Sequence, residues 1–499
     1  MQRRQFFTLS GSALGAVLLS QCARSRPTSS PSNSVNALPV TLPDSPPVFT
    51  SQNGRLAVDL SAEPGTLNTG NQALAIWGYN GQSPGPRLEV KPGDRVQLTF
   101  TNRLPAPTNL HFHGLHIPPT GSGDNVFRQI EPGDTFTYDF EIPADHPATL
   151  AYYHPHLHGH VAQQIFAGLG GLIVVRGDLD DLLQQNGVDI PEQFLVLKDF
   201  DPAGIEDGER FAQPHHGAQM IGREGAIDTV NGHVQPQLAI APQGWLRLRI
   251  VNAATSKFYN LRLEDHPFHL IATDGGSLAQ PQTLDRLLLA PGERADLLIQ
   301  GDRDRTTYSL INEPYQRTAG GMGMGMGMGR GMGMMGRRSD PNTPTVLATL
   351  TYTDTSPTPF TLPPALIPVD SLPQPSQTRE FRLHHGMNPG HGMAFLINGQ
   401  AFQGDTVHTT VTVGTTEDWL IQNIDIMDHP FHLHTNRFQV IERNGQPLTP
   451  PAWKDTVLVA AGDTVRIRIP FRTYQGRTVY HCHILDHEEL GMMGVVEMV

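Results

Sequence analysis

The chain has 499 residues, a formal net charge of −13, 50 glycines and 42 prolines. This length is too great for one hydrophobic core and predicts two to four domains. The negative charge argues against a nucleic-acid partner or an anionic membrane surface. Turn-forming residues are abundant and helix-period apolar stripes are scarce, so we expect an all-β composition of short strands joined by tight turns.

The N-terminus has the pattern of an export signal. Arg3 and Arg4 precede an apolar run that ends at Leu19. This arrangement resembles a twin-arginine signal, and the run is too short to persist as a transmembrane span. Cys22 lies in a context that partly fits a lipoprotein box, so either a lipid anchor at Cys22 or its removal with the signal is expected. Residues 1–47 are interpreted as export signal and flexible tether, which predicts a periplasmic or otherwise exported protein.

Three segments of the remaining chain repeat one pattern. They begin at Tyr79, Val230 and Ile397, and each runs from an Asn-Gly turn through an apolar strand, a Gly-containing turn and an alternating strand to a final Asn. Asn-Gly is a strong hairpin signal, and period-two alternation suits a half-buried strand. The domain-sized spacing of the copies predicts three related β-sandwich domains, at residues 48–178, 190–355 and 376–499.

A methionine-rich segment, "GGMGMGMGMGRGMGMMGRR", occupies residues 320–338 and belongs to the second domain. It has no periodicity that could bury a core, so a mobile loop is expected. Thioethers favour Cu(I), and the loop is therefore either a Cu(I)-capturing element or a passive low-complexity segment. A second soft patch, "HHGMNPGHGM", begins at His384, and the Pro-rich run before it is expected to be an interdomain linker.

Histidines gather in four short motifs, HFHG, HPH, HPFHLH and HCH, which contain His111, His113, His154, His156, His429, His432, His434, His481 and His483. Because side chains alternate along a strand, His481 and His483 share one face while Cys482 points to the other. The same parity puts His432 and His434 together and His429 opposite them. Two metal sites joined around Cys482 are therefore predicted.

The first site combines Cys482 with His429, His487 and Met492, in a Cys-x4-His-x4-Met spacing. Two imidazoles, one thiolate and a weak axial thioether describe a blue-copper centre, with Met493 as the alternative axial ligand. The second site gathers eight imidazoles, which suit several copper ions better than one. Its members are His111, His113, His154, His156, His432, His434, His481 and His483.

The four motifs match, in order and spacing, those of three-domain multicopper oxidases, and the chain resembles the branch with bacterial laccases and cuprous oxidases from Val48 to Val499. The resemblance implies three cupredoxin-like Greek-key β-sandwich domains and four copper ions per chain. It assigns the type 2 copper to His111 and His432. It assigns the type 3 pair to His113, His154, His156, His434, His481 and His483.

By the same resemblance, the chain oxidises Cu(I), small phenols or both, reduces dioxygen to water, and contributes to copper tolerance. Glu488 and Asp124 are the expected proton-relay acids. The alternatives are a laccase with a passive methionine-rich loop, a copper-binding electron carrier and a copper-dependent nitrite reductase. The intact set of ligand positions argues against a copper-free scaffold.

Two further histidine groups are expected to bind no metal. The hexapeptide at residues 265–270 repeats the one at 428–433, but it lacks an accompanying cysteine or HxH pair and is interpreted as a decayed duplicate in the core. His158 and His160 continue the alternation of His154 and His156, but the eight imidazoles of the second site are already assigned without them.

Overall fold

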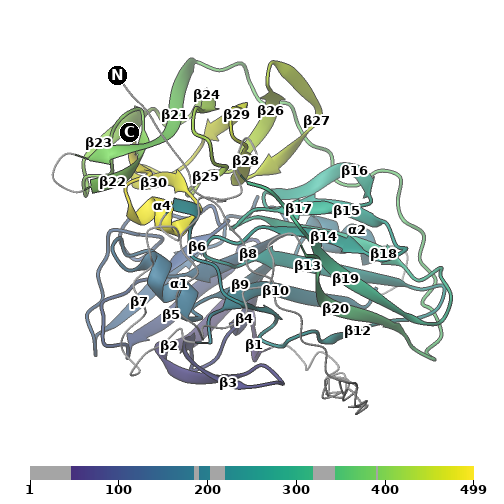
Figure 1. The fold of residues 1–499 in the computed structure, drawn as a ribbon. Coiled ribbons are helices and arrows are strands. Elements are labelled where there is room, and N and C mark those ends of the chain that lie inside the picture. The colour runs from purple at the N-terminus through teal and green to yellow at the C-terminus, as the bar shows by residue number, and fades with distance from the viewer. Residues whose placement is uncertain (1–45, 185–189, 203–219, 318–342, 389–391) are drawn as a thin grey trace, which may run out of the picture. The chain divides into compact units, whose positions relative to one another are not determined.

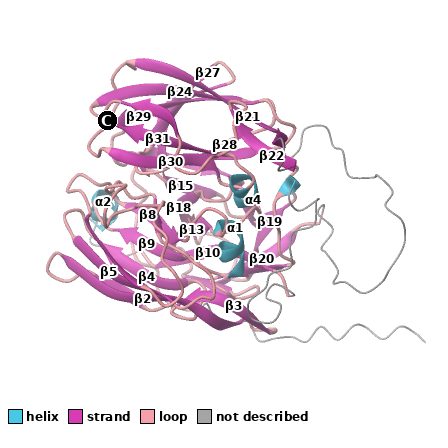
Figure 2. Ribbon diagram, turned by 90° about the vertical axis from the view of Figure 1, so that its left-hand side faces the viewer, coloured by secondary structure: helices cyan, strands magenta, loops and turns pink. Residues whose placement is uncertain are grey.

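The computed structural model describes residues 46–184, 190–202, 220–317, 343–388 and 392–499. Strands predominate in these ranges, and the helices are few and short (Figure 2), so the all-β prediction is confirmed. No helix in the described ranges is long and apolar enough to cross a membrane. The expected export signal and the methionine-rich segment lie outside the described residues.

The described strands form six sheets, and three successive stretches of the chain contribute two sheets each (Figure 1). The first two have the strand orders β3(Ala73–Tyr79)-β2(Arg55–Asn68)-β5(Arg95–Asn102)-β7(Thr135–Glu141) and β1(Val48–Thr50)-β4(Gly85–Val90)-β9(Gly171–Val175)-β8(Thr149–His154)-β6(His111–His113). This stretch also carries the helices α1(Val161–Ala167) and α2(Asp178–Gln184).

The middle and last stretches repeat one arrangement, a six-stranded sheet followed by a five-stranded sheet. In the middle stretch these are β11(Ile227–Val230)-β10(Glu192–Phe200)-β13(Trp245–Asn252)-β18(Arg294–Gln300)-β15(Phe268–Thr273)-β16(Gly276–Leu284) and β12(Gln237–Ile240)-β20(Thr345–Tyr352)-β19(Thr307–Glu313)-β14(Tyr259–Leu263)-β17(Leu287–Leu289). In the last they are β22(Gly392–Ile397)-β21(Gln377–Asn388)-β24(Thr415–Asn423)-β29(Thr464–Phe471)-β26(Phe438–Arg443)-β27(Gln446–Lys454) and β23(Val407–Val411)-β31(Met493–Met498)-β30(Gly476–Cys482)-β25(His429–Leu433)-β28(Thr456–Val459), with the helix α4(Leu485–Glu489).

The three predicted Asn-Gly turns have one geometry. Asn80, Asn231 and Asn398 have φ values of 53°, 52° and 55°, and the glycine after each also has positive φ, as a type I′ hairpin turn requires. Each asparagine Oδ1 accepts a backbone N–H at 2.8 Å from a neighbouring strand, the donors being Ser61, Val196 and Arg382. The repeat read from the sequence is therefore a repeat of hydrogen bonds.

The asparagine that ends each copy also has a constant role. The Nδ2 groups of Asn102, Asn252 and Asn423 each donate to one backbone carbonyl of the loop that follows and to a second carbonyl further along the chain. Each Oδ1 accepts the backbone N–H two residues later. These buried amides fix the loops that lead to the histidine strands of the first and last stretches.

One arginine connects all three stretches. The guanidinium of Arg294, on β18, donates to the backbone carbonyl of Leu150 on β8 at 2.9 Å and to that of Asp274 at 3.0 Å. It also binds both carboxylate oxygens of Asp455, at 2.7 and 2.5 Å. Arg294 is fully buried, so this contact is an internal junction, and it lies beside the histidines.

Candidate metal centres

Strands β25 and β30 carry the motifs HPFHLH and HCH, and they pair with each other. Their antiparallel register aligns His432 with His481 and Phe431 with Cys482. Alternation along both strands then sends the aligned imidazoles to one face and Cys482 to the other. This local geometry produces the two sets of donors that the sequence predicts.

The first set contains His429, Cys482 and His487. The Cys482 Sγ lies 3.5 Å from His429 Nδ1 and 3.7 Å from His487 Nδ1, and the two Nδ1 atoms are 3.2 Å apart. All three residues are fully buried. Burial raises the pKa of the Cys482 thiol, so a metal ion must displace its proton on binding.

Hydrogen bonds to the outer ring nitrogens orient both imidazoles. His429 Nε2 lies 3.2 Å from a carboxylate oxygen of Asp425, and His487 Nε2 donates to the Met220 carbonyl at 2.9 Å. The ring of Phe395 stacks on His487 with centroids 3.8 Å apart. Each ring therefore presents Nδ1 to the thiol, as outer partners of metal-binding histidines do.

The two candidate axial methionines lie in different environments. Met492 is buried in the same hydrophobic cluster as Cys482, and its backbone carbonyl accepts the Cys482 N–H at 3.0 Å. Met493 belongs to a separate cluster with Val126, Val479 and Val495. The packing therefore favours Met492 as the axial partner.

The second set brings together the eight imidazoles, all buried, from β6, β8, β25, β30 and the residues directly after them. His481 Nε2 lies 3.1 Å from both His156 Nε2 and His434 Nε2. Three groups of donor atoms lie close enough to share an ion: His111 with His113 and His154, His111 with His432 and His434, and His156 with His434 and His481.

Five of these imidazoles are oriented from outside the cluster. Their outer nitrogens lie within 3.0 Å of protein oxygens, in the pairs His111 Nδ1 with Asp124, His113 Nε2 with Asp455, His154 Nδ1 with the Pro155 carbonyl, His432 Nδ1 with the Asp455 carbonyl and His481 Nδ1 with the Cys482 carbonyl. The opposite nitrogen of each ring then faces the cluster.

The inner nitrogens fit copper. The Nε2 atoms of His111 and His432 face the cluster and are buried without a hydrogen-bond partner, an arrangement that is costly unless an ion occupies the site. Burial lowers the pKa of each of the eight rings below the ordinary value. Neutral imidazoles at short mutual distances are suitable ligands for copper.

His483 differs from the other seven. It belongs to none of the groups of three donors found in the described chain. Its Nε2 lies 3.0 Å from the hydroxyl of Tyr152, while its Nδ1 has no partner. The ring is still close to the cluster, 5.1 Å from that of His113 and 5.7 Å from that of His154.

The two expected proton-relay acids lie against this cluster. Both oxygens of Asp124 are 2.9 Å from His111 Nδ1, and burial raises the pKa of Asp124 to about 7. Glu488 approaches His481 Nδ1 at 3.5 Å and His156 Nδ1 at 3.9 Å, and neither oxygen has a hydrogen-bond partner. Burial raises the pKa of Glu488 well above its ordinary value, so both acids can hold a proton near neutral pH.

Sequence reasoning missed a second carboxylate support, Asp455. It lies 3.0 Å from His113 Nε2 and is clamped by Arg294. Burial raises the pKa of Asp455, but the Arg294 charge outweighs burial and the net shift is downward. No motif marks Asp455, because its role depends on an arginine far away in the chain.

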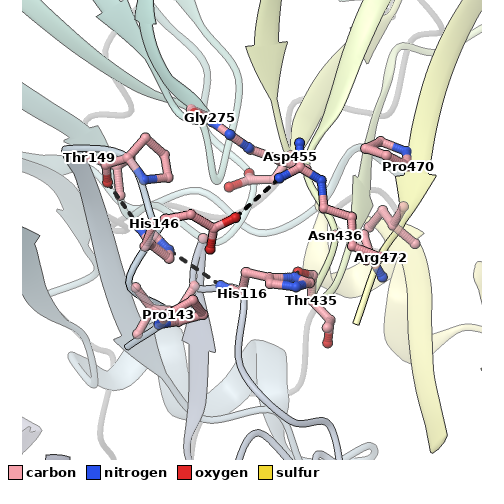
Figure 3. A pocket seen from close by; sticks show the side chains of 16 residues that line it. His116, Pro143, His146, Thr149, Gly275, Thr435, Asn436, Asp455, Pro470 and Arg472 are labelled. Atoms are coloured by element: carbon pink, nitrogen blue, oxygen red, sulfur yellow. Dashed lines mark hydrogen bonds and ion pairs between the residues drawn. The ribbon is translucent and has the colours of Figure 1, made fainter. Parts of the chain in front are cut away.

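A small pocket lies beside Asp455 (Figure 3). His116 and His146 line one wall, where the His116 N–H is 3.4 Å from His146 Nε2, and Arg437 and Arg472 line another. None of the eight clustered histidines contributes to the lining. The pocket therefore reaches Asp455, the carboxylate that orients His113, but none of the eight imidazoles themselves.

The histidines expected to bind no metal lie elsewhere. His266 Nε2 lies 2.9 Å from the Tyr352 hydroxyl, and His269 Nδ1 lies 3.2 Å from the Thr283 hydroxyl. His266 is buried but His269 is partly exposed, so only the former is a core residue. His158 is exposed, and neither it nor His160 joins a group of three donors in the described ranges.

Comparisons with known proteins agree with this geometry. Models of the multicopper oxidase family match residues 62–180, 198–329 and 372–499. A laccase of Bacillus subtilis is 28% identical over 84% of this chain and 89% of its own length. The cell division protein FtsP of Dickeya dadantii is 31% identical over 98% of this chain and 97% of its own.

Solved structures extend the likeness to the fold. A multicopper oxidase from Campylobacter jejuni, described as a metallo-oxidase, superposes with a TM-score of 0.77 at 27% identity, over 92% of this chain and 95% of its own. The six described sheets are thus those of cupredoxin-like domains, as expected from the sequence. The chain belongs to the multicopper oxidase family.

Proposed function

We propose that the chain is an oxidase that takes electrons singly from a reducing substrate and uses four of them to reduce dioxygen to two waters. The observation that carries this proposal is the pair of buried donor sets that meet at Cys482. An electron-carrier protein needs only the first set, and a copper-dependent nitrite reductase needs fewer imidazoles than the second set provides. The eight-imidazole cluster therefore favours the oxidase.

Four copper ions per chain are assigned to these donors. The type 1 ion is assigned to His429, Cys482, His487 and Met492, and the type 2 ion to His111 and His432. The type 3 pair is assigned to His113, His154, His156, His434, His481 and His483. When bound, copper supplies the one-electron redox chemistry that the side chains lack.

The chain's own residues connect the two sets. Cys482 is covalently joined to His481 and His483, so three consecutive residues form the shortest path between them. Residues of both sets are buried, which excludes water from the path and keeps the imidazoles neutral. The first set lies on the far side of the strand from the cluster, so reductant and dioxygen are kept apart.

Proton delivery is assigned to Glu488 and Asp124. Reduction of dioxygen to water consumes one proton per electron, and both carboxyls contact or approach cluster imidazoles while their pKa values are raised by burial. A carboxyl that is protonated near neutral pH can give up its proton and be refilled from solvent.

The reducing substrate is proposed to be Cu(I), a small phenol or both. Arg317, the last described residue before residues 318–342, accepts the Asp428 N–H through its carbonyl at 3.0 Å. Asp428 directly precedes the candidate type 1 ligand His429. The methionine-rich segment therefore follows a residue that is held beside the electron-entry site, which supports Cu(I) delivery by its thioethers.

Oxygen uptake by copper-loaded protein tests this assignment, with Cu(I) or a simple phenol as reductant. Deletion of residues 320–338 is expected to reduce Cu(I) turnover and to spare or raise phenol turnover. Replacing the seven methionines between Met322 and Met335 by leucine, which keeps the length, is the matched control and should have the same effect on Cu(I). If neither change affects either substrate, the protein is a laccase with a passive segment. Absence of uptake with both would remove the oxidase assignment.

The relatives named FtsP are described as cell division proteins. The alternative function for this chain is therefore a scaffold that binds no copper. Buried imidazole nitrogens without partners are costly to retain in a scaffold, so the oxidase is favoured. Measured copper content near four per chain supports the oxidase, and a chain that binds none supports the scaffold.

Export and the domain bounds are proposed from the sequence. Export through the twin-arginine route, with or without a lipid at Cys22, would place the protein where copper tolerance is needed. The domains are proposed at residues 48–178, 190–355 and 376–499. The middle domain is proposed to bind no copper in its core and to support the cluster through Arg294.

A further inference from the structure

The small pocket beside Asp455 lies where the three stretches of the chain meet (Figure 3). The first stretch contributes His116 and His146, the last contributes Arg437 and Arg472, and the middle one contributes the turn before β16. The pocket has room for a few water molecules or one small ion. A larger groove shares His146 and both arginines with it, so small solutes can reach the pocket from the surface.

Arg437 is a half-buried guanidinium without a carboxylate partner. It lies over the Trp453 ring at 4.2 Å and donates to the Gly275 carbonyl at 2.8 Å. No carboxylate in the described ranges forms an ion pair with it, whereas the buried Arg294 binds both oxygens of a carboxylate. Burial and the nearby Arg472 charge lower the pKa of Arg437 to about 10. The guanidinium is therefore still charged at neutral pH, and that charge is uncompensated.

The other charged groups of the pocket do not neutralise Arg437. Arg472 adds a second cation, and its contact with Asp145 is 3.5 Å long with the Asp145 side chain 76% exposed. An exposed pair of this kind contributes little. Asp455 is already paired with Arg294 through both carboxylate oxygens. The pocket therefore has an excess of positive charge.

The Thr435 hydroxyl supplies a further donor. Thr435 lines the pocket directly after the cluster imidazole His434, and its φ of +65° is unusual for a β-branched residue. Its Oγ1 is buried without a hydrogen-bond partner in the described part of the chain, which is costly unless a ligand accepts from it. Two guanidiniums and one unpartnered hydroxyl are suitable donors for an anion with several oxygens.

We propose that this pocket binds one small oxyanion, of the size of inorganic phosphate, between Arg437 and Arg472. The inference goes beyond the oxidase assignment and does not depend on it. The anion compensates both guanidiniums and accepts the O–H of Thr435. Because Arg437 also holds the Gly275 carbonyl of the middle stretch, an anion that fixes this guanidinium stabilises the junction of the stretches. Ligands as large as nucleotides do not fit in a pocket of this size.

Calorimetric titration of copper-loaded protein with inorganic phosphate, at an ionic strength held constant with sodium chloride, tests the site. One phosphate per chain is expected to bind, and the midpoint of thermal unfolding should rise with phosphate until the site is saturated. Arg437→Met should abolish binding. Arg472→Met, at an exposed position where folding is not at risk, should weaken it by about tenfold or more. Arg477→Met is the matched control, because it removes an equal charge from an exposed ion pair outside the pocket and should bind phosphate normally.

Absence of phosphate binding, or binding that Arg472→Met leaves unchanged, would overturn the inference. Bound copper can also attract phosphate, but the substitution at Arg472 does not alter that binding, so it counts as the second of these outcomes. Equal weakening by Arg472→Met and Arg477→Met would likewise overturn the inference, because it would show a response to net charge rather than to a site.

Discussion

Removing the Arg294 guanidinium should destabilise the protein far more than removal of a surface arginine. In Arg294→Met the buried Asp455 carboxylate loses both of its ion-pair hydrogen bonds, and the carbonyls of Leu150 and Asp274 lose a donor. Breaking a buried ion pair from one side costs about 3–5 kcal/mol, because the remaining charge is left uncompensated. Urea unfolding of copper-free protein measures the loss.

A second substitution isolates the cause. Asp455→Asn removes the stranded charge, so the double variant should recover more than half of the loss caused by Arg294→Met. Arg95→Met is the control, because its pair with Asp139 is two-thirds exposed on the arginine side and should contribute little. A loss below about 1 kcal/mol for Arg294→Met, or no recovery on adding Asp455→Asn, would refute the electrostatic reasoning.

Three further outcomes are expected. Glu488→Gln should slow oxygen uptake and leave the visible copper spectrum intact, and unchanged turnover would end its assignment as a proton donor. Met492→Leu should retain copper and raise the potential of the type 1 ion, whereas Met493→Leu should change neither; a shift in both would contradict the packing argument. Metal-free protein should lose stability as pH falls below 6.5, the ordinary pKa of an imidazole, since burial lowers the pKa of His154 to about 3 and also lowers the pKa values of the other seven cluster imidazoles. The unfolded chain then binds more protons than the folded one. The free energy of unfolding therefore falls by up to about 1.4 kcal/mol per pH unit for each ring. Asp124 and Glu488 beside the cluster have pKa values that burial raises, so they oppose this loss as two groups against eight. Urea midpoints that do not change between pH 7 and 5 would contradict the prediction.

The features predictable from sequence are those set by local rules. Period-two alternation separated Cys482 from His481 and His483, and Asn-Gly turns revealed the repeat, because both depend on neighbouring residues alone. The axial ligand was left open between two adjacent methionines. Gly491, directly before them, has a φ of +111° and no room for a Cβ beside Ala401, a local geometry that no sequence pattern predicts.

The supporting residues could not be predicted, because distant strands supply them. Asp455 reaches His113 from another sheet pair, and its own partner Arg294 comes from a third. The phenol of Tyr152 meets His483 across more than 300 residues of chain. Two acids, Asp425 and Asp428, closely precede His429 in the sequence, but only the structure singles out Asp425 as the residue that orients the ring.

The pairing of β25 with β30 also limits how this region can change during evolution. One residue inserted between Tyr480 and His481 would turn the thiol toward the imidazole face and the two flanking histidines away from it. A substitution at Tyr480 alters packing and the hydrogen bond of its hydroxyl with Thr409, but it does not change which face the following residues occupy. Divergent relatives that keep both donor sets should therefore vary in residue identity along this strand and conserve its length.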